Sequence, residues 1–210
     1  MLKTPEVAEP VSKVDDNTLM LRLQHGREDA FYELVSRYKH LMVNYLCRMI
    51  GDYDTAVDMA QEVFLRVFRN HRQYDTRLKF STWIYRIATN LAIDEIRKRK
   101  RRSASLLTAG AIPRDYTEEA DRTPPPTMRT IRNPEEQMLR REARDRILEA
   151  IDTLPEDQKH IFLLKEMEQL QLDEISRITD IKIGTLKSRL HRARQTLMER
   201  LGGYITGGIE

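Results

Sequence analysis

The sequence of 210 residues has little of what several protein classes require. Cys47 is the only cysteine, so no disulfide can form within the chain, and the five histidines are scattered without metal-ligand spacing. No apolar run approaches the roughly 20 residues of a membrane-spanning helix. The first residues lack the apolar core of a signal peptide. These absences predict a cytoplasmic protein, and we expect no metal and no cofactor.

The sequence also has no sustained alternation of apolar and polar residues, which is the pattern of a β-strand. Helices are therefore the expected secondary structure. Helical patterns cover residues 15–102 and 134–201, each long enough for a small domain. Residues 103–133 contain four prolines and many Thr, Arg and Glu, a composition typical of a linker. Residues 1–14 and 202–210 are expected to be tails. The predicted fold is therefore all-α, with two small helical domains joined by a long flexible linker.

Residues 80–102 most clearly indicate nucleic-acid binding. Ser81 can cap a helix here. The apolar stripe expected to face the core, at i, i+3, i+4 and i+7, is Ile84, Ile87, Ala88 and Leu91. A different face carries donors, cations and an aromatic ring: Tyr85, Arg86, Thr89, Asn90, Ile93 and Arg97. Such groups can hold phosphates or stack on bases, although a merely solvated face would have the same pattern.

The same helix ends in a run of six consecutive Lys or Arg residues, 97–102. Like charges in adjacent turns repel one another, and a polyanion beside the helix would relieve that repulsion. A nuclear-targeting patch is the other common meaning of such a run. The run therefore strengthens the prediction of nucleic-acid binding for residues 80–102.

Residues 173–201 have the layout of a helix-turn-helix, which makes the second domain a four-helix domain containing that motif. The predicted buried stripe of its second helix is Leu186, Leu190, Ala193 and Leu197. Residues 182–200 contain six Lys or Arg and one acid, whereas residues 166–180 contain five acids and one Arg. A basic surface beside an acidic one suggests an oriented electrostatic surface, as in proteins that bind nucleic acid. A plain helical hairpin with a basic surface remains the alternative.

Together these segments resemble a bacterial extracytoplasmic-function (ECF, group IV) RNA polymerase sigma factor over about residues 17–100 and 133–201. The motifs that carry the resemblance occur in the family's order: Asp29-Ala30-Phe31, DMAQEVF at 58–64, FSTWIYRIATNLAID at 80–94, Leu154-Pro155 and GTLKSRLHRAR at 184–194. The resemblance implies a non-catalytic subunit that binds core RNA polymerase and directs promoter-specific initiation. Such a factor reads the −35 element as duplex and melts and reads the −10 element.

The resemblance also implies roles for individual residues. The core-polymerase-binding face, expected to meet the β′ coiled coil, is Asp58, Gln61, Glu62 and Leu65. The residues expected at the −10 element are Tyr74, Arg86, Asn90, Arg97 and Lys98, with the amide of Asn90 reading a base and the ring of Tyr74 stacking. The residues expected at the −35 element are Thr185, Lys187, Ser188, Arg189, His191 and Arg192. Further implied partners are the β subunit and an anti-sigma factor, which would hold the chain at the inner membrane.

Two other functions fit parts of the sequence. A helix-turn-helix regulator that binds only duplex DNA would use residues 173–201 but leaves the acidic face of residues 54–70 unexplained. A nucleic-acid hydrolase would use Asp58 and Glu62 as a metal pair, but no third ligand or general base is spaced to join them. One departure from the family concerns Asp180, which stands where a turn glycine is frequent. Because Asp tolerates the left-handed conformation better than most residues, we expect the turn to be kept.

Overall fold

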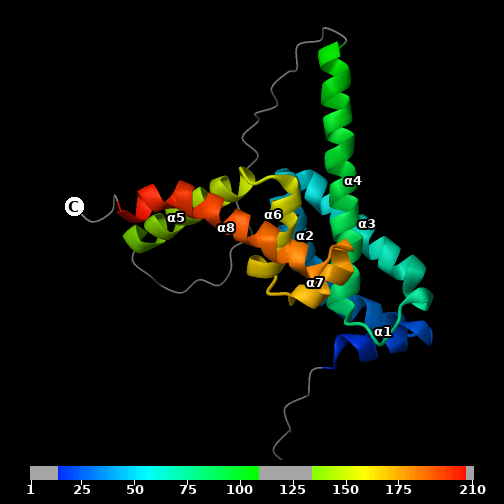
Figure 1. The fold of residues 1–210 in the computed structure, drawn as a ribbon. Coiled ribbons are helices and arrows are strands. Elements are labelled where there is room, and N and C mark those ends of the chain that lie inside the picture. The colour runs from blue at the N-terminus through cyan, green and yellow to red at the C-terminus, as the bar shows by residue number, and fades with distance from the viewer. Residues whose placement is uncertain (1–13, 109–133, 207–210) are drawn as a thin grey trace, which may run out of the picture.

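The computed structural model describes residues 14–108 and 134–206, and every regular element in these ranges is helical (Figure 1). The first domain contains α1 (Asp16–Gln24), α2 (Glu28–Ile50), α3 (Tyr53–Asn70), the short 3₁₀ turn η1 (His71–Gln73) and α4 (Phe80–Thr108). The second contains α5 (Pro134–Asp152), α6 (Glu156–Phe162), the π-helical η2 (Leu163–Met167), α7 (Leu172–Thr179) and α8 (Ile183–Thr206). No helix in the described ranges is long and apolar enough to span a membrane.

The ends of the first helices follow the expected local rules. The Asp15 side chain caps α1 by accepting a hydrogen bond from the Thr18 backbone N–H at 2.9 Å. Gly51 ends α2 in the left-handed conformation, with φ of 77°. Asp52 then caps α3 by accepting from the Thr55 N–H at 2.7 Å. The turn between α2 and α3 is therefore encoded by two adjacent residues, Gly51 and Asp52.

The start of α4 differs from the expected capping by Ser81. The helix begins one residue earlier, at Phe80, and the Phe80 N–H donates to Oδ1 of Asn17 at 3.2 Å. The acceptor that a local cap would supply thus comes from α1, 63 residues earlier in the chain. This contact joins the first turn of α4 to α1, the first helix of the domain.

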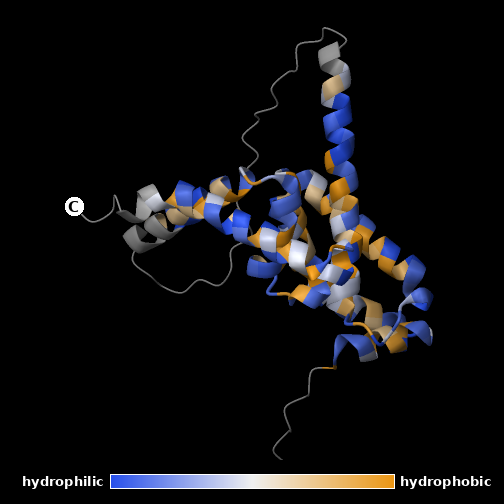
Figure 2. Cartoon of the chain, viewed as in Figure 1, coloured by the Kyte–Doolittle hydropathy of each residue, from blue (hydrophilic) through white to orange (hydrophobic). Residues whose placement is uncertain are grey.

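The first domain packs α1 to α4 around one apolar core. Its largest fully buried side chains include Met20, Leu34, Met42, Tyr45, Phe80 and Ile84. The hydroxyl groups of Tyr45 and Thr89 lie 2.8 Å apart, so the polar end of Tyr45 is satisfied between α2 and α4. Figure 2 shows the hydrophobic colour on the turns of α4 that meet the other helices and the hydrophilic colour over its basic run.

The helix-turn-helix forms from α7 and α8 as predicted. Asp180 occupies the left-handed region with φ of 57°, which confirms that the turn is kept without glycine. Ser176 Oγ donates to the Ile181 carbonyl oxygen at 2.7 Å and closes the turn. The predicted stripe of Leu186, Leu190, Ala193 and Leu197 is buried. The outer side of α8 is consequently directed away from the domain core.

Two helices run further than the sequence predicted. α4 continues through Thr108, six residues into the predicted linker, and projects beyond the rest of the chain (Figure 1). α8 continues through Thr206, into the predicted C-terminal tail. The remainder of the predicted linker, at 109–133, and residues 1–13 and 207–210 of the predicted tails lie outside the described residues. The two domains are in contact, because α7 packs along α4 (Figure 1).

Candidate nucleic-acid interface and polymerase-docking face

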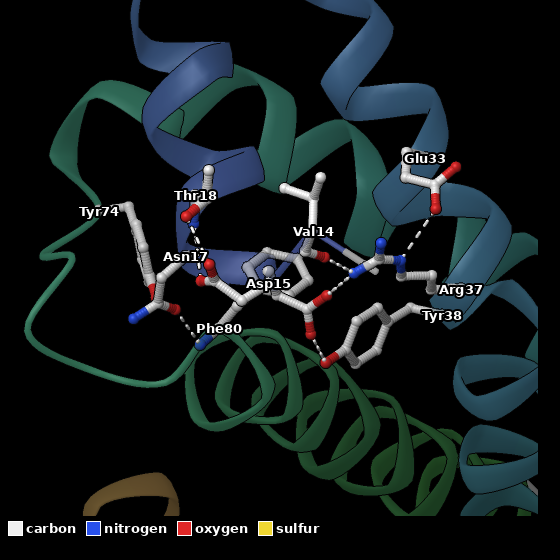
Figure 3. A network of polar contacts seen from close by, with 10 residues as sticks. Val14, Asp15, Asn17, Thr18, Glu33, Arg37, Tyr38, Tyr74 and Phe80 are labelled. Carbon is white, nitrogen blue, oxygen red and sulfur yellow. Dashed lines mark hydrogen bonds and ion pairs between the residues drawn. The ribbon is translucent and has the colours of Figure 1, made fainter. Parts of the chain in front are cut away.

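The loop that leads into α4 is held by the amide side chain of Asn17 in α1 (Figure 3). Its Nδ2 donates to the carbonyl oxygens of Thr76 at 2.9 Å and Leu78 at 3.0 Å. Its Oδ1 accepts from the Tyr74 hydroxyl at 2.8 Å and from the Phe80 N–H. One side chain therefore uses both donors and its acceptor to define the course of residues 74–80.

A second amide of α1 holds the start of the same loop. Gln24 Nε2 donates to the carbonyl oxygens of His71 at 2.9 Å and Tyr74 at 3.0 Å. Gln24 and Asn17 lie seven residues apart and so occupy the same face of α1. The loop backbone is thus bound at four carbonyl oxygens by a single helix, which leaves it little freedom to rearrange.

An ion-pair network attaches α1 in turn to α2 (Figure 3). Arg37 Nη1 lies 2.6 Å from both Asp16 Oδ1 and the Val14 carbonyl oxygen, and Arg37 Nε lies 3.0 Å from Glu33. The Tyr38 hydroxyl donates to Asp16 at 2.5 Å. Burial, with the Asp16 carboxylate beside it, raises the pKa of Tyr38, so this hydroxyl stays protonated. The clamp on the loop is therefore itself anchored to a helix that runs through the core.

The structure revises the role expected for Tyr74. Its side chain is only 4% exposed, and its hydroxyl donates to the Leu78 carbonyl oxygen at 2.6 Å as well as to Asn17. Its ring lies 4.9 Å from that of Trp83 and 6.2 Å from that of Phe80, between centroids. The ring is therefore part of the core and presents no face on which a base could stack. In this structure Tyr74 shapes the loop from within.

The outer face of α4 presents four of the predicted −10 residues. Arg86, Asn90, Arg97 and Lys98 are all exposed. Arg86 and Asn90 are one turn apart and share that face with Arg97, two turns further on. A row of this kind places an amide between cations, which is suited to a base edge flanked by phosphates.

Two other residues of the predicted polar face are buried instead. Tyr85 is 3% exposed and Thr89 is fully buried. The ring of Tyr85 meets that of Tyr45 edge-on with centroids 5.3 Å apart, and its hydroxyl donates to Glu168 of the second domain. Burial raises the pKa of Tyr85. The periodicity grouped these residues with the polar ones, but it could not show that both meet Tyr45 in the core of the first domain, or that Tyr85 also reaches Glu168.

The basic run at 97–102 is largely paired within the protein. Four of its six members lie within 4.0 Å of a carboxylate. Three of these carboxylate contacts come from the preceding turn of α4 itself, and the fourth joins Lys100 to Glu156 of the second domain at 2.7 Å. The repulsion expected from the sequence is therefore partly relieved without a nucleic acid.

The predicted polymerase-docking face lies on α3. Asp58 and Gln61 are exposed, and Leu65 is 47% exposed, an apolar side chain left without cover. Glu62 pairs with Arg66 at 2.8 Å, and the hydrogen bond from Arg66 lowers the pKa of the Glu62 carboxyl, so it is ionised at neutral pH. The opposite face of α3 is buried in the core through Ala56, Ala60, Val63, Phe64 and Val67. The acidic face is thus fixed in orientation and open to a partner.

The predicted −35 residues lie along the outer side of α8. Thr185, Lys187, Ser188, His191 and Arg192 are exposed. Arg189 differs from them, because it is half-buried and lies 3.4 Å from Asp157 of α6. We therefore interpret Arg189 as a link between α8 and its own domain, and the other five as the surface available to a groove.

The sequence matches two family models: Sigma-70 region 2 over residues 34–102 and Sigma-70 region 4 over residues 144–197. It is 36% identical over 187 residues to the ECF RNA polymerase sigma factor SigW of Bacillus subtilis, covering 86% of this chain and 93% of that protein. The chain belongs to the ECF RNA polymerase sigma factors. It is also 33% identical over 185 residues to the ECF RNA polymerase sigma-E factor of Escherichia coli K12, covering 88% of this chain and 93% of that protein.

Two solved structures share the fold of this ECF sigma factor. CnrH, in complex with the cytosolic domain of CnrY, aligns with a TM-score of 0.60 and 19% identity over 90% of this chain and 97% of that one. The sigma factor RpoE of Bartonella quintana, in complex with the anti-sigma factor NepR, aligns with a TM-score of 0.62 and 19% identity over 83% and 98% of the two chains. The predicted family and all-helical two-domain fold are confirmed.

Membership of the family also establishes the general activity. The sigma factor is a non-catalytic subunit of RNA polymerase that directs promoter-specific transcription initiation, and its region 2 binds the −10 element. α4 and the loop before it belong to region 2, and α7 and α8 belong to region 4.

Proposed function

We propose that this sigma factor reads the −10 element through the outer face of α4 and the loop held by α1. The observation that carries the proposal is the position of exposed Asn90 on a helix whose entry loop is bound to Asn17 and Gln24. Extruding a base from the duplex costs a few kcal/mol of stacking, which a binding surface must offset. A surface that is already ordered offsets more of that cost, because less entropy is lost on binding.

In this proposal Asn90 contacts an extruded base, and Arg86, Arg97 and Lys98 hold phosphates of the non-template strand. Asn17 and Tyr74 act as positioning residues, which keep the loop in its binding conformation without touching DNA. Promoter opening is the distinguishing test. Transcripts made by purified core polymerase with this factor are mapped at their 5′ ends, and permanganate then probes thymines near −10. Reactive thymines support melting, whereas unreactive ones would indicate a regulator that binds duplex only.

We further propose that α8 enters the major groove of the −35 element. Its exposed Lys187, Ser188, His191 and Arg192 provide donors for base edges and phosphates, and Thr185 lies in its first turn. The diameter of an α-helix matches the major groove, where each base pair presents a distinct donor and acceptor pattern. The buried stripe of α8 fixes which side is offered to the groove.

Replacing Lys187 should distinguish binding of the −35 duplex from binding of the −10 single strand. We expect Lys187→Ala to weaken binding to a −35 duplex by about 1 kcal/mol or more and to reduce the salt slope by about one unit if Lys187 holds a phosphate. Binding of a single-stranded −10 oligonucleotide should be unchanged. Fluorescence anisotropy at several NaCl concentrations measures both. Met198→Ala, on an exposed part of the same helix, is the matched control. Equal losses for both DNAs would contradict the assignment of α8 to the −35 element.

The acidic face of α3 is proposed to dock on the β′ coiled coil of core polymerase. Charged side chains around an exposed apolar one resemble the rim and centre of a protein interface. The exposed Leu65 would supply the apolar contact, and Asp58 and Glu62 would orient the partner. The β subunit is the further polymerase partner expected for the second domain.

Charge reversal on α3 tests this docking. We expect Asp58→Lys to weaken assembly with core polymerase about tenfold or more, because like charges then oppose across the interface. Glu199→Lys, on exposed α8, changes the net charge equally and should leave assembly nearly unchanged. Native gel shift with titrated core polymerase gives the two dissociation constants. If both variants lose the same affinity, the effect is one of overall charge and the α3 assignment is wrong.

We also propose that this chain is cytoplasmic and that an anti-sigma factor regulates it by holding it at the inner membrane. The support is that two of the aligned structures, those of CnrH and of the sigma factor RpoE, are complexes with CnrY and with the anti-sigma factor NepR. Affinity purification of the tagged chain from unstressed cells tests the proposal. A stoichiometric partner other than polymerase is expected, and recovery of polymerase alone would contradict it.

A further inference from the structure

One arginine of the basic run at 97–102 contacts the body of the first domain. Arg99 Nη2 donates to the Thr55 hydroxyl oxygen, in the first turn of α3, at 2.9 Å. Its Nε donates to Glu95, one turn earlier on α4, at 3.2 Å. Arg99 is partly buried, whereas the neighbouring Lys98 is exposed. The basic run is therefore not a uniform surface.

The helical period explains why Arg99 differs from the residues assigned to DNA. At about 100° per residue, Arg86, Asn90 and Arg97 lie within about 40° of one another around α4. Arg99 lies about 180° from Asn90 in the same projection, on the side of α4 that packs against α3. The face proposed to bind the −10 strand therefore does not include Arg99.

The hydroxyl that accepts from Arg99 belongs to the capped end of α3. Asp52 caps this helix by accepting from the Thr55 N–H. Hydrogen bonds from the Thr55 hydroxyl and N–H lower the pKa of the Asp52 carboxyl, and the Arg99 cation adds to that effect. Because a hydroxyl can donate one hydrogen bond and still accept another, Thr55 links the guanidinium to the capping carboxylate.

Arg99 also lies where α4 leaves the first domain. Ala92 is the last buried residue in the described part of this helix, and residues 100–105, which follow Arg99, are all exposed. Residues 93–108 thus form an arm with little apolar cover. An isolated helix of this length is marginal in water, and like charges along it weaken it further. The arm therefore depends on contacts near its base to stay helical.

Other contacts at the base of the arm are weaker or less directional. Lys100 pairs with Glu156 at 2.7 Å, but both side chains are exposed, and such pairs contribute little. Ile96 packs partly against the core, and apolar burial has no preferred direction. The guanidinium of Arg99 is planar and bonds through two of its nitrogen atoms, so it also fixes the rotation of the helix.

We infer that Arg99 is a positioning residue that braces the arm on α3, so that Arg97 and Lys98 stay beside Asn90. Arg99 itself binds no phosphate, although it lies within the basic run. This inference rests on the proposed role of the outer face of α4 in −10 binding. If loss of the brace leaves the arm ordered in about one-fifth of the molecules, the apparent affinity for a −10 strand falls about fivefold.

Substitutions on α3 test the brace without removing a cation from α4. Thr55→Val deletes the hydroxyl but keeps the β-branched shape and the N–H that bonds to Asp52. Thr55→Ser keeps the hydroxyl and is the matched control. On α4, Arg99→Gln removes the guanidinium, and Arg101→Gln makes the same change two residues away at an exposed position. Arginine and glutamine have similar helix propensities, so neither change weakens the helix directly.

The first measurement is hydrogen–deuterium exchange of the full chain, read on peptides from residues 93–108. Exchange should be at least threefold faster in Thr55→Val and Arg99→Gln than in wild type. It should be unchanged in Thr55→Ser and Arg101→Gln, which leave the brace intact. Equal exchange in all five proteins would overturn the brace. Equally faster exchange in peptides from α2 would assign the effect to the whole domain and would overturn a local brace as well.

The second measurement is anisotropy of a fluorescent single strand that carries the −10 element of a mapped promoter, at several NaCl concentrations. Thr55→Val and Arg99→Gln should bind it about fivefold more weakly than wild type. Their salt slopes should be unchanged, because the same phosphates are bound once the arm is ordered. Arg97→Gln shows the effect of a lost phosphate contact and should reduce the slope by about 0.7. Thr55→Ser should bind as wild type.

The outcomes separate the brace from the proposed function. If Thr55→Val binds as wild type while Arg99→Gln loses affinity and about 0.7 of the slope, Arg99 is a phosphate contact and the brace is overturned. If Arg97→Gln alone loses affinity, the positioning role is overturned and the −10 assignment stands. If none of the three loses affinity although Thr55→Val exchanges faster, the arm is braced but the proposed −10 role of the arm fails, and positioning fails with it.

Discussion

Asn17→Ala should abolish tight binding of the −10 strand without any change to a residue proposed to touch DNA. The substitution removes four hydrogen bonds, to Thr76, Leu78, Tyr74 and Phe80, and leaves their partly buried partners to find water or go unpaired. We expect the free energy of unfolding to fall by about 2–6 kcal/mol, since each of the four lost bonds contributes about 0.5–1.5 kcal/mol. Denaturant unfolding and oligonucleotide anisotropy measure the two effects.

The controls separate positioning of the loop from general destabilisation. Thr18→Ala changes the adjacent residue, whose hydroxyl contacts only the Asp15 cap in the described structure, and should keep −10 binding. Asn17→Asp retains the acceptor for Tyr74 and Phe80 but loses both donors, so its affinity should fall between wild type and Asn17→Ala. Assembly with core polymerase, measured below the unfolding transition, should be unchanged in all three. A parallel loss of polymerase binding would mean that the domain as a whole had been weakened.

Asn90→Ala should impair promoter opening more than any other single truncation on the outer face of α4. An amide that reads a base edge contributes about 1–3 kcal/mol of discrimination, so open-complex formation should fall by about tenfold or more. Asn90 is exposed and makes no contribution to the core, so stability should be unaffected. Permanganate reactivity at the −10 thymines gives the open fraction directly.

Asp94→Asn is the matched control for Asn90→Ala, because it lies one turn further along the same exposed face. It should leave opening within about twofold of wild type. Binding of core polymerase should be equal in both variants, since α3 is untouched. If Asn90→Ala reduces polymerase binding as much as opening, its proposed role in reading a base is wrong.

The helices of this protein could be predicted from the sequence because each depends on local periodicity and local capping. The stripe from Leu186 to Leu197 appears in the sequence as a local helical period, and the left-handed turn at Asp180 involves only neighbours along the chain. The exposure of Arg86 and Asn90 also follows from their phase relative to Ile84 and similar core residues. The same local features carry the resemblance to sigma factors, so the family could be predicted from the amino-acid sequence alone.

The residues that sequence reasoning missed or misassigned all depend on distant parts of the chain. Asn17 holds carbonyl oxygens 59 and 61 residues away, and no local pattern relates an amide to a distant backbone. An aromatic ring in a loop such as that of Tyr74 often stacks on a base, but here α1 and Trp83 enclose it. For Tyr85, the helical period gives the side of α4 on which the side chain lies, but it does not show that Glu168 of the second domain contacts it. The excess of acids at 166–180 was the one signal of that contact.

The projecting part of α4 has a mechanical consequence. No residue from Ile93 to Ser105 is buried, yet the helix continues to Thr108 (Figure 1). At 1.5 Å per residue, α4 extends about 24 Å beyond Ala92, its last buried residue in the described chain. The chain between the two domains therefore starts at the tip of this helix, whose length affects the local concentration of one domain near the other. The helicity of this arm, in addition to the contacts of Arg99 with Thr55 and of Lys100 with Glu156, therefore affects how the two domains meet.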